Sequence, residues 1–237
     1  MRTYESSRAR VRAMYRLPGD LRPRRALELF VAGSQPMIDA EWRAQTTVRN
    51  RAYGRGAESI ADTNETAAFD FILLHWTLDS ASVGRKRQSG RDRQIALLGE
   101  VSRALAPGGI VAGCVTNRYS LAQLRQHWMG RSGHGKSQHP AGHTPRSLRS
   151  MLESSGIGDI EVFTALPSAD NPEALVGTSR RVSVPHFVRF VESRRGQSTR
   201  ISYMARRLLA SAGLYGYLVG SLVFWGRKPC SISSSSR

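Results

Sequence analysis

Residues Phe69–Trp76 read Phe-Asp-Phe-Ile-Leu-Leu-His-Trp, an almost unbroken apolar run of strand length. Such a run is typical of a strand that is buried on both faces, as the central strands of a parallel sheet are. After a polar loop, apolar residues recur at helical spacing, at Ile95, Leu98, Val101 and Leu105. Pro107-Gly108-Gly109 ends this predicted helix, and Ile110–Thr116 is the next predicted strand. A strand, a helix and a strand in this order form a crossover unit with parallel strands.

A second unit of the same kind follows toward the C-terminus. The predicted elements are, in order, a helix at Tyr119–Met129, a helix from Thr144-Pro145 to Gly156, a strand at Ile160–Thr164, one or two helices over residues 185–211, and a strand at Tyr217–Trp225. The sequence therefore predicts a single α/β domain with a doubly wound, mostly parallel sheet.

The N-terminal part gives weaker signals. Ala26–Val31 suits a short strand that Gly33 closes, and Asp39–Arg55 suits a helix with a narrow apolar face. We expect residues 1–25 to form a basic arm, residues 26–229 the domain, and residues 230–237 a disordered serine-rich tail.

Composition narrows the class of protein. A chain of 237 residues with 40% apolar residues can bury one sizeable core. Two cysteines exclude a disulfide scaffold and a cysteine-based zinc module. The net charge of +17 favours polyanions or anionic membrane surfaces as partners. The basic residues are nearly all arginine and are scattered along the chain without interleaved aromatics, so nucleic acid is a disfavoured partner and contact with a membrane surface stays open.

The start of the chain bears on localisation. No apolar segment of signal-peptide type opens it, so we expect a cytoplasmic protein. The first 25 residues are rich in arginine and serine, which fits either an organelle-targeting segment or a solvated basic arm.

Several segments, in a fixed order, resemble the second half of a class I S-adenosylmethionine-dependent methyltransferase of the type 11-like group. They are Phe69–Trp76, Arg103–Val111 with its proline and glycine pair, Thr116–Arg118, His143–Ile157, and Val223–Pro229. The resemblance covers about residues 69–229 and implies a Rossmann-like sheet whose last strand is antiparallel. It implies S-adenosylmethionine as cofactor.

The resemblance also implies a set of cofactor-binding residues. Glu28 and Gly33 match the family's first strand and the turn after it. Asp39 occupies the expected end of a second strand, Met37-Ile38-Asp39, where an acidic side chain would hold ribose. Asp62 would contact adenine, and His75 stands at the end of the strand at Phe69–Trp76.

The function so implied is methyl transfer to a small-molecule or glycan- or lipid-type acceptor. Such transfer depends on holding two reactants in line, so no single catalytic residue is predicted. Only one glycine of the family's first turn is present, Gly33, and this supports a first alternative, a methyltransferase-like domain that has lost cofactor binding. A second alternative is a basic binder of membrane surfaces or nucleic acid.

Three further patterns have competing interpretations. Gly130–Ser137 satisfies the G-x-x-x-x-G-K-[ST] pattern of phosphate-binding loops, but it follows a predicted helix instead of a strand, which favours a loop over the mouth of the site. His134, His139 and His143 suit either a metal site or a polar lid, with His143 as a candidate base. Leu208–Trp225 carries no charge and suits either a membrane span or a helix end, a turn and a strand.

Overall fold

The computed structural model describes residues 23–31, 37–38, 47–53, 66–82, 89–120, 142–178, 180–194, 196 and 200–230. The phosphate-loop pattern at Gly130–Ser137, the predicted helix beyond Ser120, and the tail from Ser231 lie outside these residues. So does the predicted N-terminal arm as far as residue 22.

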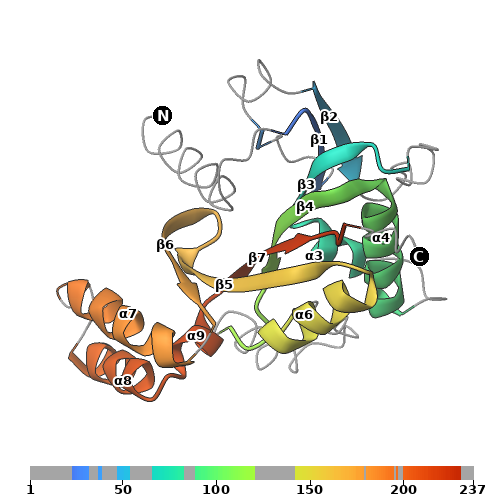
Figure 1. Cartoon of the computed structure of the whole chain (residues 1–237). Helices are drawn as coiled ribbons and strands as arrows, with labels where there is room; N and C mark the ends of the chain where they lie inside the picture. The colour runs from blue at the N-terminus through green and yellow to red at the C-terminus, as the bar shows by residue number, and fades with distance from the viewer. Residues whose placement is uncertain are drawn as a thin grey trace, which may run out of the picture.

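A seven-stranded mixed sheet forms the centre of the protein (Figure 1). Its strands are β1 (Arg25–Val31), β2 (Thr47–Tyr53), β3 (Phe69–His75), β4 (Leu105–Thr116), β5 (Gly158–Ser168), β6 (Asn171–Gly177) and β7 (Ser221–Arg227), in the spatial order β2-β1-β3-β4-β7-β5-β6. β2, β1, β3 and β4 are parallel, whereas β7 runs antiparallel between β4 and β5, and β6 forms an antiparallel hairpin with β5. The predicted doubly wound sheet with an antiparallel last strand is confirmed.

The direction of winding reverses at β1. From β1 the chain moves outward to β2 on one side, and it then returns to the other side of β1 to form β3 and β4. The carboxyl ends of β1 and β3 are therefore a topological switch point, the place where doubly wound sheets leave a crevice for ligands.

Three helices pack on one face of the sheet: α3 (Thr77–Ser82), α4 (Gly90–Ala104) and α6 (Pro145–Ser154). Their apolar side chains meet those of the central strands in the largest core cluster. α6 begins with a capping box between Thr144 and Ser147, as the sequence Thr144-Pro145 predicts. On the other face, Met37, Ile38 and Trp76 are among the residues packed on the sheet.

A second helical group lies at the end of the sheet beyond β6 (Figure 1). It consists of α7 (Arg180–Ser193), α8 (Arg200–Ser211) and α9 (Tyr215–Leu218). Phe187, Val191, Tyr203 and Ala210 build a small core of their own with Leu166 and Val176 of the β5–β6 hairpin. This group extends the domain instead of covering the sheet.

The structure corrects two N-terminal predictions. The strand next to β1 is β2, Thr47–Tyr53, so the second strand is not Met37-Ile38-Asp39. The helix predicted over Asp39–Arg55 is wrong over residues 47–53, which form β2. The connection between the two strands, residues 32–46, is long enough for the crossover that parallel strands require. β2, Thr-Val-Arg-Asn-Arg-Ala-Tyr, is mostly polar and lies at the sheet edge. Its aliphatic residues Val48 and Ala52 are four positions apart, a spacing that a helix with a narrow apolar face also gives.

The uncharged segment Leu208–Trp225 is divided among the end of α8, a turn at Gly213, α9, and the first part of β7. The interpretation as helix end, turn and strand is confirmed, with α9 added, and the membrane span is wrong. Across the described ranges, no helix has both the length and the apolar character that a membrane crossing needs. α3 and β6 were not predicted.

Candidate functional site

The carboxyl ends of β1 and β3 lie side by side at the switch point. Phe30 of β1 is in register with His75 of β3, and His75 is in register with Cys114 of β4. Thr77, the first residue of α3, is buried and donates a hydrogen bond of 2.7 Å from Oγ1 to the carbonyl of Leu29. This bond fixes the turn after β3 to the end of β1.

His75, a predicted cofactor residue, is buried at the end of β3. Burial lowers the pKa of His75 to about 4, because desolvation outweighs the opposing effect of the Asp170 carboxylate. Its Nδ1 lies 3.4 Å from Sγ of Cys114. The imidazole is therefore uncharged at neutral pH.

Trp76 directly follows β3 and has a φ of 58°, which is rare for a bulky side chain. Its indole Nε1 donates a hydrogen bond of 2.9 Å to Oδ1 of Asp170, in the turn between β5 and β6. The rings of Trp76 and His75 meet edge to face with centroids 6.0 Å apart. An aromatic ring, a carboxylate and a neutral imidazole thus gather here in a strongly basic chain.

Asp79 connects α3 to the end of β4. Its Oδ2 accepts hydrogen bonds from the backbone N–H of Thr116 (2.7 Å) and from Oγ1 of Thr116 (2.6 Å). Burial raises the pKa of Asp79 to about 6, although both hydrogen bonds act to lower it. The carboxyl ends of β3 and β4 are held together by this side chain.

Glu28, a predicted cofactor residue, is fully buried in β1. Its Oε1 accepts a hydrogen bond from the backbone N–H of Met37, and its Oε2 accepts one of 3.0 Å from Ile38. Glu28 thus anchors the segment that follows the first strand. The other predicted cofactor residues, Gly33, Asp39 and Asp62, lie outside the described residues.

His143 is also buried, with its Nε2 3.0 Å from Nε2 of Gln94. Burial, with a smaller effect of Arg91, lowers the pKa of His143 to about 4. Its main chain pairs with that of Asn117 at the end of β4. We therefore assign His143 a structural position, whereas His134 and His139 lie outside the described residues. Within the described ranges, no three side chains of metal-binding type come together.

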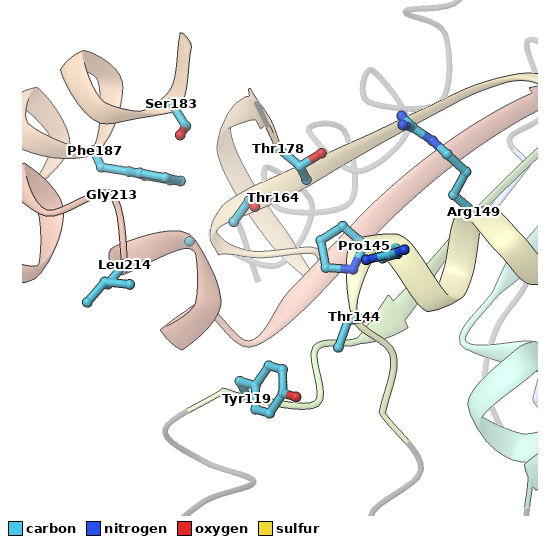
Figure 2. A pocket seen from close by; sticks show the side chains of 12 residues that line it. Tyr119, Thr144, Pro145, Arg149, Thr164, Thr178, Ser183, Phe187, Gly213 and Leu214 are labelled. Carbon is cyan, nitrogen blue, oxygen red and sulfur yellow. The ribbon is translucent and has the colours of Figure 1, made fainter. Parts of the chain in front are cut away.

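A cavity of about 500 Å³ opens farther along the same edge of the sheet (Figure 2). Five parts of the chain line it: Tyr119 after β4; Thr144, Pro145, Arg146 and Arg149 of α6 and its cap; Thr164 and Thr178 of the β5–β6 hairpin; Ser183 and Phe187 of α7; and Gly213, Leu214 and Gly216 at the α8–α9 turn. Its volume is in the range of small-molecule sites.

Asn117 connects this cavity to the end of β4. Its side-chain Nδ2 donates a hydrogen bond of 3.0 Å to the carbonyl of Gly216, and its backbone N–H donates to Gly220. The wall formed by the α8–α9 turn is thus attached to the strand next to β3. The cavity and the switch point share one edge of the sheet.

Sequence reasoning did not find the cavity. Its lining comes from segments between residues 119 and 216 that no local pattern relates. One available signal is Arg146 in the first turn of α6, where acidic residues are favoured. Gly216 gives no such signal in the sequence. In the structure a Cβ there would lie 2.9 Å from the ring of Phe187, so glycine lets α9 approach α7 closely.

No family model matches the chain, and no curated protein matches its sequence. Among solved structures, a SAM-dependent methyltransferase from Archaeoglobus fulgidus aligns at 12% identity over 95% of this chain and 94% of that one, with a TM-score of 0.50. The chain has the class I methyltransferase fold.

A second structure with this methyltransferase fold is phosphoethanolamine N-methyltransferase 2 from Haemonchus contortus, solved with phosphomonomethylethanolamine and S-adenosylhomocysteine. It aligns at 11% identity over 93% of this chain, with a TM-score of 0.50, and this chain spans 53% of its length. At these identities the methyltransferase fold is the common property.

Proposed function

We propose that the protein transfers a methyl group from S-adenosylmethionine to a small-molecule acceptor. The observation that carries this proposal is the switch point between β1 and β3, where His75 ends β3 and Trp76 follows it with a hydrogen bond to Asp170. Doubly wound sheets leave a crevice for ligands at this position. The cavity beside β4 supplies a second compartment on the same edge.

The described residues fit a cationic cofactor. A sulfonium group carries a positive charge, so a protonated histidine beside it would repel it. His75 is neutral at pH 7 because burial keeps its pKa low. The indole of Trp76 attracts cations through its ring face, by about 0.5–2 kcal/mol, and Asp170 adds a carboxylate.

The backbone of Trp76 supports a functional position. A φ of 58° in a tryptophan costs on the order of 1–3 kcal/mol, and such strain is typically retained at ligand sites. Here the hydrogen bond to Asp170 holds the ring in place against that strain. The carboxylate of Asp170 therefore acts as a positioning group for the ring.

The cofactor, when bound, supplies an electrophilic methyl group. The protein contributes the relative positions of the two reactants. Thr77 and Asp79 tie the ends of β1, β3 and β4 together, so that the crevice and the cavity keep a fixed relation. Holding two reactants in line accounts for much of such a rate enhancement, and no described side chain has to act as a base.

Calorimetric titration of the purified protein with S-adenosylmethionine and with S-adenosylhomocysteine, at moderate salt, tests the proposal. We expect micromolar binding of the cofactor. W76A should weaken S-adenosylmethionine by about 3- to 30-fold, because the cation–ring attraction is lost. The affinity for S-adenosylhomocysteine, whose thioether is uncharged, should fall by less.

The control for this variant is F190A, since Phe190 is an aromatic residue on α7, in the other helical group. F190A should leave both affinities unchanged in a folded sample. Absence of binding to folded wild-type protein at millimolar cofactor would overturn the proposal and favour a domain that has the fold without the cofactor.

The acceptor class is the finer part of the proposal. We include a glycan- or lipid-type acceptor besides simpler small molecules, because the cavity combines hydroxyl groups with an apolar wall. Release of S-adenosylhomocysteine in a screen of amines, phenols, carboxylates, sugars and short-chain lipids measures which class reacts.

A further inference from the structure

The lining of the cavity beside β4 carries a net positive charge. Among the described lining residues there is no aspartate or glutamate, and the formal charges are those of Arg146 and Arg149. The remaining polar groups are hydroxyls of tyrosine, threonine and serine. A cavity with this set of donors favours an anion over a cation or an uncharged polar ligand.

Arg146 is an unfavourable choice for helix stability. It lies in the first turn of α6, directly after Pro145, and that turn contains no acidic residue. A positive charge at a helix N-terminus opposes the helix dipole. A side chain that conflicts with its local structure in this way is expected at functional sites.

Two arginines of the adjoining helical group have carboxylate partners, whereas Arg146 has none among the described residues. In the adjoining helical group Arg194 pairs with Glu173, and Arg207 lies 3.6 Å from Glu192. Across the described ranges, the side chain of Arg146 has no ion pair or hydrogen bond. Arg149 extends along β5, where its Nη2 donates to the carbonyl of Ile160 at 3.3 Å (Figure 2). Arg146 is the stronger candidate to hold an anion.

The opposite side of the cavity is apolar. Leu214 and Tyr119 are large side chains that remain 47% and 45% exposed, and both line the cavity. Figure 2 shows them across the cavity from Arg149. Phe187 lies behind this wall in the helical core. The surface thus offers apolar contact at one side and guanidinium groups at the other.

We infer that the cavity binds an acceptor made of an anionic group, held by Arg146 with Arg149 at the rim, and an apolar body that packs against Leu214 and Tyr119. Naming this ligand as the acceptor rests on the proposed function. Phosphate and carboxylate share the recognising chemistry, because a guanidinium fork matches the paired oxygens of both.

The test is calorimetric titration of the full chain, without cofactor, with phenyl phosphate, benzoate and benzyl alcohol. We expect one anion at least to bind about tenfold more tightly than the uncharged alcohol. A preference for phenyl phosphate assigns the anion as phosphate, and a preference for benzoate assigns it as carboxylate. Equal affinity for all three probes, or no binding of either anion, would overturn the inference.

Variants assign the two sides of the cavity. R146Q should weaken binding of the preferred anion about tenfold and leave the affinity for benzyl alcohol unchanged. The anion affinity of R146K should lie between those of R146Q and the wild type. R149Q should cause a smaller loss. L214A should weaken all three probes by a similar factor. R103Q is the matched control, since Arg103 is exposed on α4 and does not line the cavity.

Loss of anion binding to the same extent in R103Q and R146Q would show only a general effect of charge and would overturn the inference. Titration of R146Q with S-adenosylmethionine separates this result from the proposed function. Intact cofactor binding with no anion binding in the wild type rejects the anion site alone. Anion binding that depends on Arg146, without cofactor binding, rejects the methyltransferase activity alone.

Discussion

At Glu28, both carboxylate oxygens accept backbone N–H groups of the segment after β1. The acceptors are buried, and the donors belong to Met37 and Ile38 on the second face of the sheet. A buried polar group is tolerated when it is hydrogen-bonded in this way. Glu28, which the family resemblance assigns to the cofactor, therefore also fixes the course of the chain after the first strand.

We predict that E28Q lowers the free energy of unfolding by about 1–3 kcal/mol, because one amide NH₂ then faces a backbone donor in a buried place. Urea unfolding without cofactor measures this effect, with a constant m-value as the check of two-state behaviour. E153Q, at an exposed position on α6, is the control and should be neutral. Unchanged stability in E28Q would contradict the anchoring role.

The residues of the site differ in how well sequence predicted them. The sequence predicts His75 as a site residue because it ends an almost unbroken apolar run, and the end of a buried parallel strand is where ligand sites form. The partnership of Trp76 with Asp170 was not predicted, since the two residues are 94 positions apart and meet only through the β5–β6 hairpin. Sequence patterns are local, whereas this pair is created by the fold.

At the scale of elements, the packing of β4 between β3 and β7 depends on a small residue. Gly113 lies where a Cβ would be 2.6 Å from the carbonyl oxygen of Leu74 and 2.6 Å from the ring of Phe224. Gly99 on α4, by contrast, is exposed and has nothing within 4 Å of such a Cβ. The two glycines have opposite consequences when alanine replaces them.

We predict that G113A destabilises the protein by at least about 1–3 kcal/mol, as overpacking in a core does. G99A should stabilise it by about 0.5–1 kcal/mol, because alanine favours the helix and the unfolded chain loses freedom. Thermal and urea unfolding of both variants provide the measurement. The same sign of change in both would refute this account of the sheet packing.

The elements that were predicted correctly share strong local signals. β3 is an almost unbroken apolar run, and α4 repeats apolar residues at helical spacing. α6 begins with the N-cap residue Thr144 followed by Pro145. β2 was not predicted because it is a polar edge strand with a weak strand signal in its own sequence. Its pairing with β1 stabilises it as a strand. Tertiary pairing decided that element.

At the scale of the whole molecule, the acid response of the described residues depends on His75, His143 and Asp79, whose pKa values burial shifts toward the neutral form. His75 and His143 fall from 6.5 to about 4, and Asp79 rises from 3.8 to about 6. Below pH 6.5 each histidine takes up a proton in the unfolded chain before it does so in the folded protein, so acid destabilises the fold. Asp79 acts in the opposite sense, because below pH 6 the folded protein takes up a proton that the unfolded chain does not yet hold.

Between pH 6 and pH 4 two histidines oppose one aspartate, which leaves one proton of net uptake on unfolding. We predict that stability falls by about 1.4 kcal/mol per pH unit on acidification. D79N keeps an oxygen for Thr116 but removes the opposing group, so the slope should double. H143Q keeps a partner for Gln94 and should make the profile nearly flat. Urea midpoints at pH 7, 6 and 5 measure the three slopes, and a D79N slope shallower than that of the wild type would reverse the sign assigned to Asp79.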